Sequence, residues 1–288
     1  MLPLIAAAIL LLFPAMGRAD SHPDAAKVVA IGGSVTEIIY ALDQQDRLVA
    51  RDTSSSYPEA ALDLPDIGYM RTLSAEGVLS VGPDLILSED GAGPPETVAL
   101  LQSAGVPFEQ IGGAFDSDEI AAKIRAVAEV LGVSDRAEAS VAAMRADFDK
   151  LDALKEDGPR KKVMFVLAVQ GGRVIASGRE TEADAIISLA GAENAVEGFE
   201  GYKPLNDEAI SAAAPDIILM MQRGDTSADL EASNEDLLAM PAMATTPAAK
   251  DKAIIRMNGL YLLGFGPRTG QAALDLHKAI YGGSDGGA

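Results

Sequence analysis

The sequence contains no cysteine. Disulfide bonds, thiolate metal sites, iron–sulfur clusters and a cysteine nucleophile are therefore excluded. Histidine is nearly as scarce, because only His22 and His277 are present, one near each end of the chain. So few imidazoles argue against a histidine-rich zinc or copper site, and a Ser-His-Asp triad would have to use one of these two residues.

Basic residues are few, and tryptophan is absent. Lys and Arg together number 23 against 43 Asp and Glu, which gives a formal net charge of −20. A nucleic-acid-binding protein needs a basic face, so no nucleic-acid partner is expected. The chain of 288 residues is 48% hydrophobic. This composition excludes a disordered protein and suits one large domain or two lobes.

Residues 1–19 are predicted to be a secretory signal peptide. An apolar run from Leu2 to Met16 is shorter than the roughly 20 residues that span a bilayer. It is followed by Gly17-Arg18-Ala19, the small-x-small pattern of a signal-peptidase site. A membrane anchor or a buried N-terminal helix is the alternative. Since an acidic, cysteine-free exported protein suits a Gram-negative envelope, we expect a periplasmic location.

Short apolar strands alternate with helical segments along the first half. Residues 27–31 are a β-branched run that enters Gly32-Gly33-Ser34, and residues 36–42 have helical spacing. Residues 76–87 indicate a short helix, a proline break and a buried strand. This alternation predicts an α/β fold with a mainly parallel sheet.

The second half repeats the pattern, with a strand predicted at 161–169 and a helix at 181–190. Three residues of the first half recur 132 positions later: Glu76 as Glu208, Pro83 as Pro215, and Asp84 as Asp216. A shared offset is the signature of an internal duplication. We therefore expect two Rossmann-like lobes with mainly parallel sheets and a ligand cleft between them.

A long helical stretch lies between the two halves. Residues 118–131 are amphipathic, and the pattern continues over 135–154. A helix of about 20 residues is about 30 Å long, which is enough to join two lobes as a stiff spine; a helix packed within one sheet is the alternative. The predicted organisation is the signal peptide 1–19, an N-terminal α/β lobe at 20–133, a connecting spine helix at 134–157 and a C-terminal α/β lobe at 158–288.

Three stretches carry a family resemblance: residues 29–38 (VAIGGSVTEI), 68–77 (GYMRTLSAEG) and 258–269 (NGLYLLGFGPRT). With two lobes and a spine, they resemble the substrate-binding proteins of ABC importers for vitamin B12, siderophores and haem. The middle stretch is most similar to periplasmic haem-binding proteins. The resemblance covers nearly the whole chain after residue 19, and it implies a carrier of haem rather than an enzyme.

The resemblance implies that Tyr69 is the axial ligand of ferric haem. A phenolate oxygen is a hard anionic ligand that suits Fe(III), and tyrosine is a known haem ligand. If the segment is extended, Arg71 projects to the same side as Tyr69 and could donate to the phenolate. On spacing alone, a turn aromatic at Tyr69 and a solvated charge at Arg71 are the favoured alternative. The region 168–172, where some relatives place a second ligand, has no histidine, so we expect five-coordinate haem.

The haem propionates require cations. The resemblance places a propionate-binding arginine at Arg223, which follows the predicted strand 217–222, and guanidinium suits carboxylates. Gly33 and Ser34 are further candidate haem contacts, because ligands bind at the carboxyl ends of strands in open α/β sheets; a simple strand-to-helix turn is the alternative. Arg268 receives no role.

Glu76 and Glu208 are predicted to dock on the transporter. In related importers, one glutamate of each lobe meets arginines of the membrane permease, and these two residues are equivalent in the repeat. A favourable charge at a helix start is the alternative. The expected partners are haem, a permease dimer in the inner membrane and an outer-membrane haem receptor upstream. The carrier is expected to be a monomer.

Two other functions compete with haem transport. A corrinoid or ferric-siderophore carrier has the same architecture, although such relatives often line the cleft with tryptophan, which is absent here. A periplasmic enzyme is the other alternative. The chain lacks a Gly-x-Ser-x-Gly elbow, and no Gly-Lys-Ser/Thr follows Gly32-Gly33, so neither a hydrolase site nor a phosphate loop is indicated.

Overall fold

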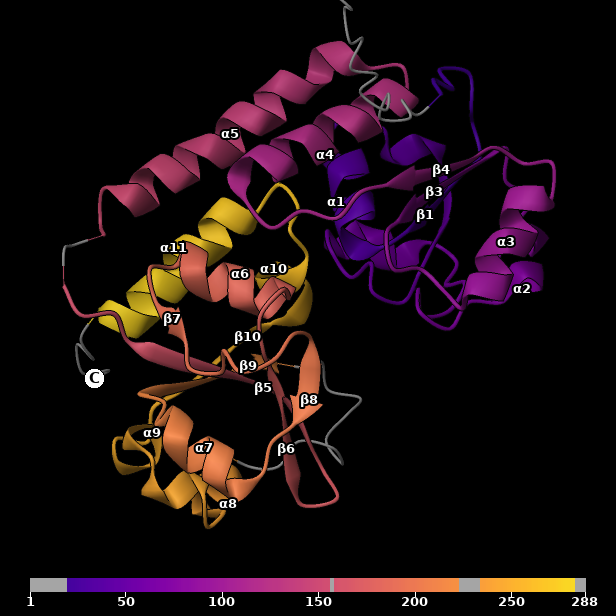
Figure 1. The fold of residues 1–288 in the computed structure, drawn as a ribbon. Coiled ribbons are helices and arrows are strands. Elements are labelled where there is room, and N and C mark those ends of the chain that lie inside the picture. Colours follow the sequence, from indigo (N-terminus) through magenta and orange to yellow (C-terminus); the bar gives the residue numbers. More distant parts are fainter. Residues whose placement is uncertain (1–19, 156–157, 223–233, 283–288) are drawn as a thin grey trace, which may run out of the picture.

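The computed structural model describes residues 20–155, 158–222 and 234–282. The predicted signal peptide 1–19 and the candidate Arg223 lie outside the described residues. The described helices, none of which is long and apolar enough to cross a membrane, and the described strands form two lobes (Figure 1).

Each lobe is built on one sheet. The first sheet has the order β2-β1-β3-β4 with all neighbours parallel; its strands are β1 (Val28–Ile31), β2 (Leu48–Arg51), β3 (Leu85–Glu89) and β4 (Phe108–Ile111). The second has the order β10-β9-β5-β6-β8, with β7 paired to β5; its strands are β5 (Lys162–Gln170), β6 (Arg173–Ser177), β7 (Glu193–Asn194), β8 (Tyr202–Pro204), β9 (Ile217–Gln222) and β10 (Ile254–Asn258). Only β5–β6 and β6–β8 are antiparallel among these described pairs. The predicted mainly parallel α/β fold is confirmed.

Helices cover both faces of each sheet. In the first lobe they are α1 (Gly33–Ala41), α2 (Ala75–Ser80), α3 (Pro95–Ser103) and α4 (Ser117–Val130), followed by α5 (Ser134–Asp152). In the second they are α6 (Glu182–Leu189), α7 (Asp207–Ala213), α8 (Asn234–Ala239), α9 (Pro247–Lys250), α10 (Gly259–Leu263) and α11 (Thr269–Tyr281). Short 3-10 helices lie at Gln45–Arg47, Glu59–Asp63 and Met243–Thr245.

The strands are buried on both faces because their side chains alternate between two clusters. In β1, Val28 and Ala30 join a central cluster, whereas Val29 and Ile31 face the cluster that α2 and α3 cover. Strand β9 behaves in the same way, with Leu219 on the central side and Met220 packed on the other side. The continuous apolar runs of the sequence follow from this two-sided burial.

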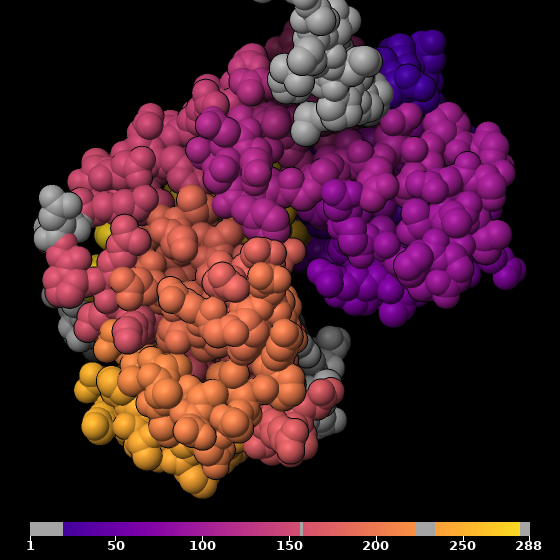
Figure 2. Space-filling view, viewed as in Figure 1, coloured from indigo at the N-terminus to yellow at the C-terminus, as the bar shows by residue number. Residues whose placement is uncertain are grey.

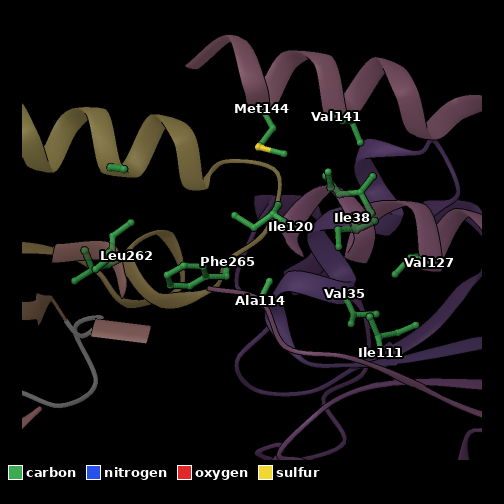
Figure 3. Close-up of a cluster of buried hydrophobic side chains, with 14 of the residues drawn as sticks. Val35, Ile38, Ile111, Ala114, Ile120, Val127, Val141, Met144, Leu262 and Phe265 are labelled. Atoms are coloured by element: carbon green, nitrogen blue, oxygen red, sulfur yellow. The ribbon is translucent and has the colours of Figure 1, made fainter. Parts of the chain in front are cut away.

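The central cluster extends through both lobes. It combines side chains of the first sheet, α4 and α5 with Phe165 of β5, Leu262 of α10 and Phe265. Figure 3 shows Leu262 and Phe265 beside Ala114 and Ile120. The lobes therefore share one hydrophobic core and are not two separately packed bodies.

Helix α5 lies along one side of this shared core (Figure 1). It packs against α4 and α11, and Val141, Met144 and Phe148 supply its buried face. The first sheet falls within residues 20–133 and the second within 158–288. The boundaries of the predicted spine helix, 134–157, remain a prediction, because α5 ends at Asp152 and residues 156–157 are not described.

The predicted duplication is visible in the hydrogen bonds. The carboxylate of Asp84 accepts the backbone N–H groups of Ala26 and Lys27 at 3.0 and 2.8 Å. That of Asp216 accepts the N–H of Lys162 at 2.8 Å. In both lobes, the aspartate before one strand fastens the start of the neighbouring strand. This shared role explains why the two aspartates keep the same spacing from Glu76 and Glu208.

Candidate functional site

The two lobes are separated by a notch on the face shown in Figure 2. The first lobe borders it with purple surface and the second with orange surface. An interlobe cleft is where ligands bind in two-lobe α/β architectures.

Tyr69 lies on a tight turn between Asp66 and the start of α2. The N–H of Thr72 donates to the carbonyl of Tyr69 at 2.8 Å and closes the turn. Gly68 precedes it with φ of +97°, a conformation that favours glycine. Met70 is buried at the centre of the turn, whereas Tyr69 is 45% exposed. The apolar anchor thus holds the phenol at the surface, where it is accessible to a ligand.

The turn is also fastened from two sides. The N–H of Thr53 donates to the carbonyl of Gly68 at 3.0 Å, and that of Leu73 donates to the carbonyl of Gly93 at 2.8 Å. Such backbone bonds fix the position of a loop that carries an exposed functional side chain.

Arg71 is exposed. Its expected projection to the same side as Tyr69 required an extended segment, and this premise is wrong because residues 69–72 form a hydrogen-bonded turn. Within the described part of the chain, neither Tyr69 nor Arg71 has a side-chain hydrogen-bond partner. Support from Arg71 for a phenolate at Tyr69 stays a prediction.

The charge of Arg71 acts on a residue of the second lobe. Burial raises the pKa of the Tyr202 phenol in β8 well above its usual range, the charge of Glu182 raises it further, and the positive charge of Arg71 acts in the opposite direction.

Gly33 and Ser34 lie at the start of α1 and are buried. A Cβ on Gly33 would collide with Leu260 of α10 and lie 2.9 Å from the carbonyl of Ser54. The Ser34 hydroxyl donates to Glu89 at 2.7 Å. Direct contact of either residue with haem would require these packed contacts to open, so their role as haem contacts stays a prediction that this geometry does not favour.

A buried ion pair lies behind the start of α1. Lys123 of α4 is 4% exposed and donates to Glu89 at the end of β3, which also receives the Ser34 hydroxyl. A buried ammonium requires such a partner because desolvation opposes its charge. The pair ties α4, β3 and α1 together beneath the cleft edge.

Arg268, to which the sequence assigned no role, joins the lobes. Its side chain donates to Glu37 of α1 at 2.8 Å, and its backbone N–H donates to the other carboxylate oxygen at 3.1 Å. The guanidinium carbon also lies 3.4 Å from the centre of the Tyr57 ring and 5.0 Å from that of Tyr261. Sequence reasoning missed this arrangement because Glu37 and Arg268 are 231 residues apart. The signal in the sequence was Glu37 itself, a glutamate within an otherwise mostly apolar helix that would need a partner if buried.

Glu76 and Glu208 occupy the same position in the two lobes. Each is exposed and is the second residue of its helix, α2 or α7. The side chains of Ser74 and Asn206 cap the respective helices. Their equivalence in the structure agrees with the repeat, and their docking role stays a prediction.

Three further residues whose side chains could bind iron, Met220, Gln170 and His277, have ordinary structural surroundings. Met220 is packed in the core, and Gln170 is exposed at the end of β5. His277 is buried, with Nδ1 2.9 Å from the carbonyl of Ala190. In the described ranges, no group of three or more His, Cys, Asp or Glu residues could hold a metal ion.

The model of the periplasmic binding protein family matches residues 28–259 of this chain. Among solved structures, the periplasmic haem-binding protein BhuT in complex with two haems is 39% identical, with a TM-score of 0.81 over 88% of this chain and 97% of its own. The apo form of the periplasmic haem-binding protein RhuT of Roseiflexus sp. RS-1 is 37% identical, with a TM-score of 0.82 over 92% and 98% of the two chains.

Two relatives with lower sequence identity are not described as haem-binding proteins. The vitamin B12-binding protein of Yersinia pestis is 25% identical over 68% of this chain and 69% of its own length. The uncharacterised ABC transporter substrate-binding lipoprotein YvrC of Bacillus subtilis is 26% identical over 67% of this chain. The match spans 62% of that lipoprotein. These relatives are solute-binding proteins rather than enzymes.

Proposed function

We propose that this chain, which belongs to the periplasmic binding protein family, captures haem in the periplasm and delivers it to the permease of an ABC importer. Haem is the transported ligand and not a catalytic cofactor, and no catalytic role is proposed. Loading from an outer-membrane receptor system, docking on a permease dimer and a monomeric carrier belong to the same proposal.

One observation carries the proposal. Tyr69 presents an exposed phenol on a backbone-fastened turn of the first lobe, in a chain that matches haem-binding proteins along almost its whole described length. A tyrosine oxygen is suited to ferric haem. The exposure of this phenol and the likeness to haem-binding proteins together support Tyr69 as the ligand for the iron.

The proposed roles divide between the lobes. Tyr69 of the first lobe binds the iron, and Arg71 beside it supplies positive charge that favours the phenolate. Arg223, which lies outside the described residues, would bind a propionate from the second lobe. Because the lobes share a core and the Glu37–Arg268 pair, the cleft is held nearly rigid, and release is left to the permease.

A titration of the protein with ferric haem tests this function. We expect saturable binding and a high-spin spectrum of the tyrosinate type. A vitamin B12 carrier is the alternative that the Yersinia relatives favour, so cyanocobalamin is titrated in parallel. Saturable binding of the corrinoid without binding of haem would reject the haem proposal and retain the importer family.

Removing both docking carboxylates should impair transport without affecting haem binding. The variant Glu76→Ala with Glu208→Ala loses two exposed charges, and exposed complementary charges act mainly on association. Haem uptake into proteoliposomes that contain the importer is the measurement.

The matched control is Glu96→Ala with Glu235→Ala. These exposed glutamates are the second residues of α3 and α8, one in each lobe. The control changes the net charge by the same amount and removes a glutamate from the same position of two helices. Equal uptake by the two double variants would contradict the docking role.

A further inference from the structure

A cavity of about 560 Å³ lies in the second lobe, apart from the turn that carries Tyr69. Strand β6, strand β8 and the start of α7 surround it, and Met240 closes one side. Its lining also includes Glu208, one of the two carboxylates proposed to meet the permease. The cavity therefore adjoins the proposed docking carboxylate of the second lobe.

The floor of the cavity is apolar and its rim is charged. Val174, Leu205 and Ile210 line it and are themselves buried. Arg173, Asp207 and Glu208 line it and are exposed. An apolar centre inside a polar rim is the anatomy of a protein–protein contact, where one buried side chain supplies much of the binding energy.

The charged residues on the rim indicate which kind of partner segment would bind in the cavity. Asp207 and Glu208 are adjacent acidic residues on a chain of net charge −20, so a partner segment with a basic residue is complementary. Across the cavity, Arg173 suits a backbone carbonyl or a carboxylate of the same segment. A loop that carries apolar side chains next to a basic residue fits both the floor and the rim, since a cavity of about 560 Å³ exceeds the volume of one side chain.

We propose that this cavity receives the apolar side chains of a periplasmic loop of the permease, whose neighbouring basic residue pairs with Glu208. The inference rests on the proposed docking function and deepens it. Charge pairing at Glu208 would direct the approach, and burial of the apolar side chains would slow dissociation.

Single cysteines provide a direct test because the chain has none of its own. Pro204→Cys places a thiol at the cavity, whose lining includes Pro204. Lys203→Cys is the matched control, because Lys203 is exposed, precedes it in β8 and is not part of the lining. Neighbouring strand residues point to opposite faces, so the two thiols report on two sides of one strand.

Labelling by a fluorescent maleimide is followed with and without the importer complex in nanodiscs. With nine-tenths of the carrier bound, the labelling rate of Pro204→Cys should fall about tenfold, since only the free population reacts. That of Lys203→Cys should change less than about twofold. Unprotected Pro204→Cys in a bound carrier, or equal protection of both thiols, would overturn the insertion of a loop into the cavity.

Two further readouts separate this inference from the proposed function. Haem binding by each cysteine variant is measured first by absorption. Protection of Pro204→Cys in a carrier that does not bind haem would retain the docking cavity and reject the cargo. Failure of the unsubstituted carrier to associate with the importer would overturn the docking function and this inference together.

Discussion

Tyr69→Phe should weaken binding of ferric haem more than about 100-fold, because changes to partners that merely orient a metal ligand already cost about 10- to 100-fold. The substitution removes the phenol oxygen and keeps the ring. If that oxygen is the iron ligand, the absorption bands of the tyrosinate complex should disappear together with the affinity. Haem titration followed by visible absorption measures both effects.

The fold should tolerate this change. Tyr69 is 45% exposed, and its side chain has no hydrogen-bond partner among the described residues. Tyr57→Phe is the matched control, since Tyr57 is 42% exposed and its ring still lies against Arg268 when the hydroxyl is removed. Haem binding by Tyr69→Phe that equals the binding by Tyr57→Phe would reject Tyr69 as the ligand.

Lys123→Ala should destabilise the protein strongly. Its ammonium is buried against Glu89, and the Ser34 hydroxyl donates to the same carboxylate oxygen. Removing one partner of a buried pair leaves an uncompensated charge and typically costs about 3–5 kcal/mol. Urea denaturation followed by circular dichroism gives the free energy of unfolding, and the midpoint should fall clearly.

A second cation of the same helix provides the control. Arg125 of α4 pairs with Glu138 at 2.7 Å, but both side chains are largely exposed, and exposed pairs contribute little to stability because solvent screens them. Replacing both buried partners, by Lys123→Met with Glu89→Gln, should recover much of the lost stability because no buried charge remains. A loss for Lys123→Ala no larger than that for Arg125→Ala would show that the buried pair does not stabilise the fold.

Much of the architecture follows from local sequence. A strand buried on both faces needs an apolar residue at every position, so segments such as 217–221 are recognisable without any partner. The aspartates at 84 and 216 each hold the start of a neighbouring strand, which gives the repeat a fixed spacing. Both signals lie within one lobe and are short-range.

The contacts between the lobes were not predictable in this way. Glu37 meets Arg268 only after the chain has built both lobes, and the sequence shows merely an acidic and a basic residue. The sequence allowed either an extended segment or a turn at Tyr69, and the burial of Met70 and the hydrogen bond between Thr72 and Tyr69 show that it is a turn. Burial of Ser34 likewise depends on Glu89 and Lys123 from elsewhere in the lobe. These contacts depend on the tertiary structure, and a single sequence does not show which distant residues will meet.

The shared core restricts how such carriers could be recombined. Helix α11, at the end of the chain, packs on α5, and Phe265 and Leu262 join the cluster of the first lobe. A chimera that took its second half from a relative would import foreign side chains at all of these contacts. It would also separate Glu37 from the Arg268 beside which it evolved. Grafting a new ligand specificity onto this scaffold is therefore a matter of exchanging the surface turns around the notch while keeping both halves of the chain.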